Sequence, residues 1–174
     1  MTNTPAILRN ERGAAAAEMA LVLPLLLAIM FGAMEVGNYF LNEHILVKAV
    51  RDGARYAARQ NFSNYSTCSG SVGNPVLADT RSVVKTGLLA GGTDRLVNWA
   101  ATSISVTMSC KTTAAGQTMG GIYNGNRNSG GTLIGAPVVT VNAIVPYTPV
   151  LASIGFSAKG LKLNASQEAA VTGI

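Results

Sequence analysis

The feature that constrains this chain most is an apolar run near its amino end. From Ala14 to Met34, 21 residues follow one another with Glu18 as the one side chain that is neither apolar nor glycine. About 20 predominantly apolar residues are needed to cross a bilayer as an α-helix. The sequence therefore predicts a membrane-spanning helix over residues 14–34.

The helix is predicted to continue beyond the membrane. Neither Pro nor paired Gly ends it at Met34, and apolar residues at helical spacing continue through residues 35–60. The full helix from Ala14 to Gln60 has 47 residues and would extend about 70 Å at 1.5 Å per residue. Its second half would then stand in water and carry an apolar stripe for a folded domain.

The charges beside the apolar run predict its orientation. Arg9 and Arg12 precede the run directly, whereas Lys48 is the one Lys or Arg among the fifteen residues after Met34. Cytoplasmic flanks of membrane helices are enriched in Lys and Arg. We therefore expect the amino end in the cytoplasm and the carboxyl domain on the oxidising side of the membrane.

Both cysteines, Cys68 and Cys110, fall in the part that is expected outside the cytoplasm. Disulfides form and persist in oxidising compartments. A bond between them would close a loop of 43 residues, which the chain-entropy model values at about 4 kcal/mol. We expect this disulfide, and two free thiols in the core are the alternative.

The composition of the remaining chain excludes several function classes. Seven Lys and Arg are scattered singly over residues 61–174, so they form no basic stripe that would bind nucleic acid. The pI near 9.5 indicates weak attraction to anionic membrane lipid or polymer. His44 is the single histidine, and neither a zinc-protease motif nor a nucleophile elbow nor a phosphate-binding loop is present. We therefore predict no catalytic, cofactor-binding or metal-binding residues and no enzyme activity, although a tethered hydrolase with a Ser or Asp nucleophile is an alternative.

The part that follows the helix is long enough for one small domain. Ser103 to Cys110 alternates between apolar and polar side chains, the clearest strand pattern in the chain, and Trp99 is expected in the core. We expect an α+β fold in which the long helix packs on a three- or four-stranded antiparallel sheet.

The expected elements are a helix over 77–89 stopped by Gly91-Gly92, strands over 103–110, 137–146 and 161–171, and loops over 61–74 and 111–135. The expected segments are a cytoplasmic leader (1–13), a transmembrane helix (14–34), its exposed continuation (35–60) and an extracytoplasmic domain (61–174).

A second signal lies where the apolar run begins. Gly13 ends the polar leader, and Glu18 follows it at the fifth position. A carboxylate deep in an apolar segment costs about 2.5 kcal/mol or more, so it needs a partner or a shallow position. If the chain were cut after Gly13, the new amine of Ala14 could pair with Glu18 of a neighbouring helix. The alternative is that Glu18 reaches the headgroups from a shallow site.

Small residues offer further contacts between helices. Ala28 and Gly32 are four positions apart, as are Ala33 and Gly37. Such pairs let the backbones of two membrane helices approach closely. We expect these four residues to contribute to helix packing.

Gly13 followed by Glu18 and a long apolar helix resembles the processing site of type IV prepilins, whose leader is removed in the cytoplasm after the Gly. The first third of the chain as a whole resembles the TadE-like family, pilin-like proteins of the tight-adherence (Flp) pilus machinery. This resemblance is carried by Arg12-Gly13 and the alanines that follow, Glu18 to Pro24, Phe31-Gly32, Glu35, and Arg51 to Ala58.

The resemblance implies a bacterial single-pass inner-membrane protein with a pilin-like fold. It implies processing by a prepilin peptidase between Gly13 and Ala14, docking through Glu18, and partners among other pilin-like subunits and the pilus assembly platform. Met19 stands where major pilins often have an aromatic residue, which favours a minor pilin or pseudopilin over the main filament subunit. The alternative function is a membrane-tethered binding module that is never incorporated into a filament and whose loop 111–135 recognises a surface ligand.

Overall fold

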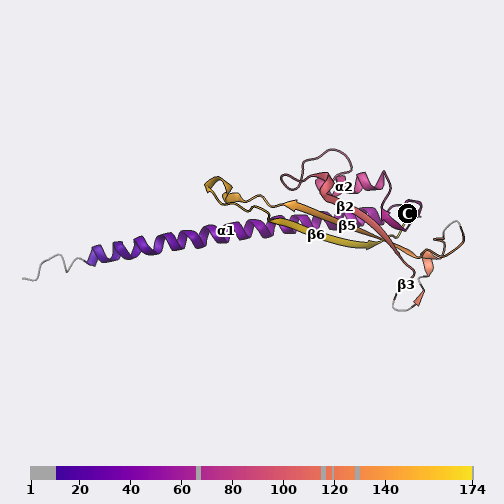
Figure 1. The fold of residues 1–174 in the computed structure, drawn as a ribbon, viewed down its shortest axis with the longest axis horizontal. Helices are drawn as coiled ribbons and strands as arrows, with labels where there is room; N and C mark the ends of the chain where they lie inside the picture. Colours follow the sequence, from indigo (N-terminus) through magenta and orange to yellow (C-terminus); the bar gives the residue numbers. More distant parts are fainter. Residues whose placement is uncertain (1–10, 66–67, 115–116, 119, 128–129, 174) are drawn as a thin grey trace, which may run out of the picture.

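The computed structural model describes residues 11–65, 68–114, 117–118, 120–127 and 130–173. One helix, α1 (Glu11–Ala58, 48 residues), runs through more than half of the length of the molecule, and the other elements gather around its carboxyl half (Figure 1). The predicted continuous helix is thus confirmed. It ends at Ala58 rather than Gln60 because the next two residues form a tighter turn, in which the N–H of Arg59 donates to the carbonyl of Tyr56.

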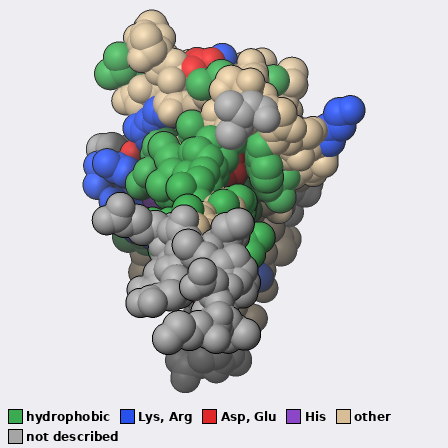
Figure 2. All heavy atoms as spheres, turned by 90° about the vertical axis from the view of Figure 1, so that its left-hand side faces the viewer, with side chains coloured by type: hydrophobic (Ala, Val, Ile, Leu, Met, Phe, Trp, Pro, Cys, Tyr) green, Lys and Arg blue, Asp and Glu red, His purple; other side chains and the backbone are tan. Residues whose placement is uncertain are grey.

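The amino half of α1 projects free of the domain. Among the described residues, Gly13–Ala58 is the one helical stretch long and apolar enough to span a membrane, and only 6 % of its most apolar window is buried within the protein. Seen from the amino end, hydrophobic side chains gather at the centre of the molecule, with Lys and Arg near its edges (Figure 2). Such exposure is what a bilayer-spanning helix needs, because lipid rather than protein covers its apolar side chains.

A four-stranded antiparallel sheet packs on the carboxyl half of α1, so the α+β fold class is confirmed. The strands are β1 (Ser69–Ser71), β2 (Ile104–Lys111), β5 (Ala136–Pro146) and β6 (Lys162–Ala170), in the spatial order β1-β2-β5-β6. A short hairpin of β3 (Thr113–Ala114) and β4 (Gln117–Thr118) extends beyond the sheet. The three predicted strands all form, each within a residue or so of its predicted bounds.

Strand β1 lies inside the stretch that was predicted to be a loop. Its three residues, Ser-Gly-Ser, carry no apolar alternation, so the sequence gives no strand signal there. Gly70 pairs with Met108 of β2. The disulfide between Cys68 and Cys110, whose Cα atoms lie 5.3 Å apart, joins the residue before β1 to the end of β2, in agreement with the expected pairing.

The second helix, α2 (Val76–Thr86), is shorter than predicted. Gly91-Gly92 was expected to stop it, but the helix ends at Gly87, which adopts a left-handed conformation with φ of 85° and donates its N–H to the carbonyl of Val83. A glycine at this position ends many helices because it lacks a Cβ. The later pair of glycines lies in the following loop.

The core forms between one face of α1 and the sheet. Leu46, Val50 and Ala57 of α1 are fully buried, together with apolar side chains of β2, β5 and β6. Trp99 is buried in the same cluster, as predicted. Tyr65 closes the end of the helix, because its buried hydroxyl donates to the carbonyl of Ala57.

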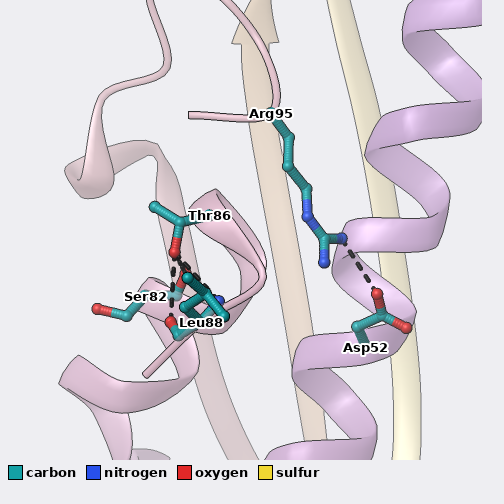
Figure 3. Close-up of polar contacts among 5 residues, drawn as sticks. All are labelled: Asp52, Ser82, Thr86, Leu88 and Arg95. Carbon is teal, nitrogen blue, oxygen red and sulfur yellow. Dashed lines mark hydrogen bonds and ion pairs between the residues drawn. The ribbon is translucent and has the colours of Figure 1, made fainter. Parts of the chain in front are cut away.

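An ion pair attaches the loop after α2 to the long helix. The guanidinium of Arg95 donates to Asp52 Oδ2 of α1 over 3.1 Å (Figure 3). In the same view, the Thr86 hydroxyl donates to the carbonyl of Ser82, and the N–H of Leu88 donates to that hydroxyl. These contacts keep the end of α2 and the loop that follows it against α1.

Gly53 is a position where α1 and α2 approach each other closely. A Cβ added to Gly53 would overlap with the Cγ2 atom of Val84, whereas one added to Gly37, also on α1, would meet nothing within 4 Å. Valine has little freedom to move aside, because its branched side chain is restricted to few rotamers. The close neighbour of Gly53 is thus helix α2 rather than the sheet.

We predict that Gly53→Ala lowers the free energy of unfolding by about 1–3 kcal/mol, since it overpacks the contact with Val84. Gly37→Ala is the matched control and should be neutral or stabilising by up to about 1 kcal/mol, because alanine favours the helix and has room. Urea unfolding of the full chain in detergent micelles, followed by circular dichroism, measures both. A Gly53→Ala protein as stable as the Gly37→Ala protein would contradict the prediction.

Candidate functional site

A buried polar cluster lies on α1 directly after the apolar run. We name it the Glu35 cluster: the side chains of Glu35, Asn38, Asn42 and Tyr147 with the backbone N–H of Leu151. Glu35 is only 6 % exposed. The Tyr147 hydroxyl donates to Glu35 Oε1, and the N–H of Leu151 donates to Oε2 at 3.1 Å. Asn38 donates to the Tyr147 hydroxyl at 2.8 Å, and Asn42 donates to the carbonyl of Asn38.

This arrangement makes a buried carboxylate tolerable. A buried charge is costly unless it is hydrogen-bonded, and here each carboxylate oxygen has a donor. Burial, followed by the hydrogen bond to Glu35, raises the pKa of Tyr147 above its ordinary value. The phenol therefore keeps its proton at neutral pH and remains a donor to the carboxylate.

The Glu35 cluster attaches the connection between β5 and β6 to the helix. This β5–β6 connection, residues 147–161, contains the short helix η5 (Val150–Ile154) and extends along α1 toward its amino end, beyond the sheet (Figure 1). The ring of Tyr147 also packs edge-on against that of Tyr39, with centroids 5.3 Å apart. The connection is thus fixed at the level where the apolar run ends.

The opposite side of α1 carries apolar side chains that no part of the domain covers. We name as the outward face the residues Ala33, Gly37, Phe40 and Leu41, all of which are exposed. At about 100° per residue they lie on the side of the helix opposite Leu46 and Gly53, which face the core. Leu41 is 65 % exposed and Phe40 54 %. Gly37, Phe40 and Leu41 follow the apolar run, so this uncovered surface reaches beyond the predicted membrane segment.

The structure separates the two pairs of small residues that were expected to pack against other helices. Ala28 and Gly32 line a groove of about 540 Å³ together with the β5–β6 connection, whereas Ala33 and Gly37 belong to the outward face. The pairs are offset by five residues and therefore point about 140° apart. One pair is thus turned toward the protein's own domain and the other away from it.

The predicted processing and docking residues lie far from the domain. Gly13, Ala14 and Glu18 are all exposed on the first turns of α1. Within the part of the chain that the structure describes, no hydrogen bond or ion pair is recorded for Glu18. Any partner of this carboxylate would therefore come from outside the described residues, such as lipid headgroups or another chain.

Sequence reasoning assigned no role to Glu35 or Tyr147. Glu35 had appeared only as part of a family pattern, and Tyr147 is the first residue after a predicted strand. The sequence does contain an indication that Glu35 is buried, since Glu35 lies one turn from Tyr39 on the face of α1 that packs on the domain. A carboxylate buried on that face needs a hydrogen-bond donor. Which donor it finds was not predictable, because Tyr147 lies 112 residues away in the sequence.

The described residues contain no group of three or more His, Cys, Asp or Glu that could hold a metal ion. His44 is exposed on α1. The features that remain for function are the surfaces of the long helix and the cluster that attaches the domain to it.

These features define a protein with one long apolar helix, one side of which carries a small α+β domain while the other side is uncovered. Residues 13–55 match the family described as TadE-like protein, so the family resemblance is confirmed over this segment. The segment contains Glu18, the outward face and Glu35. No curated protein and no solved structure matches the chain.

We predict that Tyr147→Phe lowers the free energy of unfolding by about 1–3 kcal/mol, because it leaves a buried carboxylate oxygen of Glu35 without its donor. Tyr39→Phe is the matched control, since within the described chain no hydrogen bond is recorded for its hydroxyl, and its effect should stay within about 0.5 kcal/mol. Urea unfolding of the full chain in detergent measures both. Equal losses in the two variants would show that the hydroxyl of Tyr147 does not stabilise the fold.

Proposed function

We propose that this protein is a minor pilin or pseudopilin needed for assembly of a Tad/Flp-type pilus. It acts without catalysis, through packing of its long helix against the helices of other pilin-like subunits. The family match over residues 13–55 supports the pilus system. The outward face supports the mode of action, and it is the observation that carries this proposal.

A helix that serves only as an anchor has no need of an apolar surface above the membrane. Exposed apolar patches on a protein surface commonly mark interaction sites. Phe40 and Leu41 are exposed beyond the apolar run, and Gly37 on the same face leaves room for a neighbouring backbone. A second helix laid along this face would cover the apolar side chains both in the membrane and above it.

Processing would prepare the amino end for the same packing. In this proposal a prepilin peptidase removes residues 1–13 on the cytoplasmic side, and Ala14 becomes the amino terminus. The new amine and Glu18 of adjacent chains then pair in lipid, where an uncompensated carboxylate is costly. The chain would be a single-pass protein of the bacterial inner membrane with its domain outside the cytoplasm, and it would contact lipid, other pilin-like subunits and the assembly platform.

The alternative of a tethered binding module explains the anchor and the domain. A tethered module gives the outward face no function, because a membrane tether needs apolar residues only as far as Met34. It also gives Glu18 no partner beyond lipid headgroups. We therefore favour the pilin-like function.

Amino-terminal sequencing of the protein purified from its native membrane is expected to begin at Ala14. We also expect Glu18→Ala to lose pilus assembly, because the variant lacks the carboxylate that pairs with the Ala14 amine. Glu43→Ala, which removes an acid farther along α1, is the control and should assemble pili at the level of the unmodified protein. A terminus at Met1 together with a fully active Glu18→Ala variant would leave only the tethered module.

The outward face can be tested with a matched pair of leucines. Leu41 lies on this face and is 65 % exposed, while Leu89 follows α2 and is 55 % exposed. We expect Leu41→Lys to abolish association with pilin-like subunits and pilus assembly, because it places a charge in an apolar contact that excludes water. Leu89→Lys should assemble normally.

Both variants should unfold at the temperature of the unmodified protein, since neither leucine is buried. Co-purification with the pilin-like subunits and counts of pili in a complemented deletion strain provide the measurement. Normal assembly of Leu41→Lys would overturn the assignment of the outward face.

A further inference from the structure

The β5–β6 connection lies beside a part of α1 that belongs to the apolar run. The groove between them is lined by Ala28, Phe31 and Gly32 from the helix and by Leu151, Gly155 and Phe156 from the connection. The hydrogen bond from Leu151 to Glu35 fixes the connection at this level. The two segments are therefore neighbours although more than a hundred residues separate them.

This position determines how deep the connection reaches. Ala28 lies six residues before Met34, which is about 9 Å along the helix from the end of the apolar run. If residues 14–34 span the bilayer, a segment beside Ala28 and Gly32 cannot stand in bulk water. It reaches the depth of about 5–10 Å at which interfacial segments bury their apolar side chains.

The side chains of the connection suit that depth. Val150, Phe156 and Leu161 are large, apolar and about half exposed, so the protein core does not account for them. Lys159 and Lys162 are exposed at the end of the connection, and residues 147–167 contain no Asp or Glu. Apolar residues accompanied by Lys are typical of segments that bind an anionic membrane surface.

The shape of the molecule is consistent with a β5–β6 connection at the membrane surface. Viewed from the amino end of α1, hydrophobic side chains gather in the middle of the molecule (Figure 2). This is the side of the domain that would meet the bilayer if α1 spans it. The β5–β6 connection is the part of the domain that extends farthest toward that side (Figure 1).

We propose that the β5–β6 connection inserts into the interface of the leaflet on the domain's side of the membrane. Phe156 contacts the acyl chains, while Lys159 of the connection and Lys162 at the start of β6 contact the phosphates of anionic phospholipid. The Glu35 cluster holds the connection in place, so the domain is fixed in height and tilt by two contacts with the membrane rather than by the helix alone. This inference rests on the membrane-spanning part of the proposed function.

Quenching by brominated lipid tests the proposal in the full chain. The protein is placed in nanodiscs of phosphatidylethanolamine and phosphatidylglycerol that hold one chain each, with bromine near the top of the acyl chains. Phe156→Trp introduces a reporter in the connection, and Ile122→Trp, at a position that is 60 % exposed on the domain, is the matched control. The unmodified protein, with buried Trp99, supplies the background.

We expect Phe156→Trp to lose most of its added emission in brominated discs, and Ile122→Trp to lose none. Leu151→Trp, in the lining of the groove beside Ala28 and Gly32, is a second reporter in case the first variant misfolds, and it should be quenched likewise. Exchange of Lys159 and Lys162 for Gln should weaken the quenching in anionic discs and leave it unchanged in discs of neutral lipid. If lysine exchange has no effect in anionic discs, the assigned headgroup contact is wrong.

Unquenched reporters at both positions would overturn the proposal. A protein helix rather than lipid would then be the candidate for the groove beside Ala28 and Gly32, because single-chain discs hold no second copy. The result is independent of pilus assembly. A chain that is cut after Gly13 and assembles normally but is not quenched keeps the proposed function and loses this inference.

Discussion

The structure depends on one constraint: a single helix has an apolar first half that suits lipid and a second half that packs on the core of a domain. From Ala14 to Met34 its side chains are apolar on all sides but for Glu18, and almost none of them is covered by protein. Beyond Met34 one face is buried against the domain while the other faces remain exposed. A helix that is apolar all round belongs in lipid, and one with an apolar stripe belongs on a core. The domain can therefore form only on the second half of α1.

Glu35 stands where these two environments meet. As the first residue after the apolar run, it could reach water, yet the domain buries its carboxylate and supplies a donor to each oxygen. A buried carboxylate that loses a donor is strongly destabilising, so the β5–β6 connection cannot move away from the helix without a large loss. The Glu35 cluster therefore joins the domain rigidly to the end of the apolar run. Movements of the helix in a membrane would be transmitted directly to the sheet.

The sequence predicted the features that depend on neighbours along the chain. The long helix followed from composition and periodicity, and β2 followed from the alternation that ends at Cys110. The disulfide was expected because both cysteines fall in the part of the chain that is predicted to lie outside the cytoplasm. The end of α2 was misplaced because several glycines could have adopted the left-handed conformation, and the chain uses the first, Gly87. Strand β1 was missed because pairing with β2, rather than its own residues, makes it a strand.

Contacts between distant segments could not be predicted from the sequence, for a different reason. Asp52 has Lys48 and Arg55 one turn away, and either could have been its partner, but it pairs with Arg95 from the loop after α2. Tyr147 reaches Glu35 only because β5 runs along α1 and ends beside it. Such partners are set by the topology of the sheet, which single-sequence patterns do not encode. Gly13, Ala14 and Glu18, the residues proposed for processing and docking, are the opposite case, since their pattern is local and can be recognised from the sequence alone.

The placement of the domain also limits where α1 can meet other helices. The domain covers the side of the helix that contains Leu46 and Gly53, and the β5–β6 connection faces Ala28 and Gly32. What remains uncovered both in the apolar run and above it is the side with Ala33, Gly37 and Leu41. A partner helix on this side could follow α1 across the membrane boundary without displacing the domain. On the side of Ala28 and Gly32 it would meet the connection near that boundary. The fold therefore restricts an uninterrupted helix contact to one face, and that face is the one with apolar side chains exposed to water.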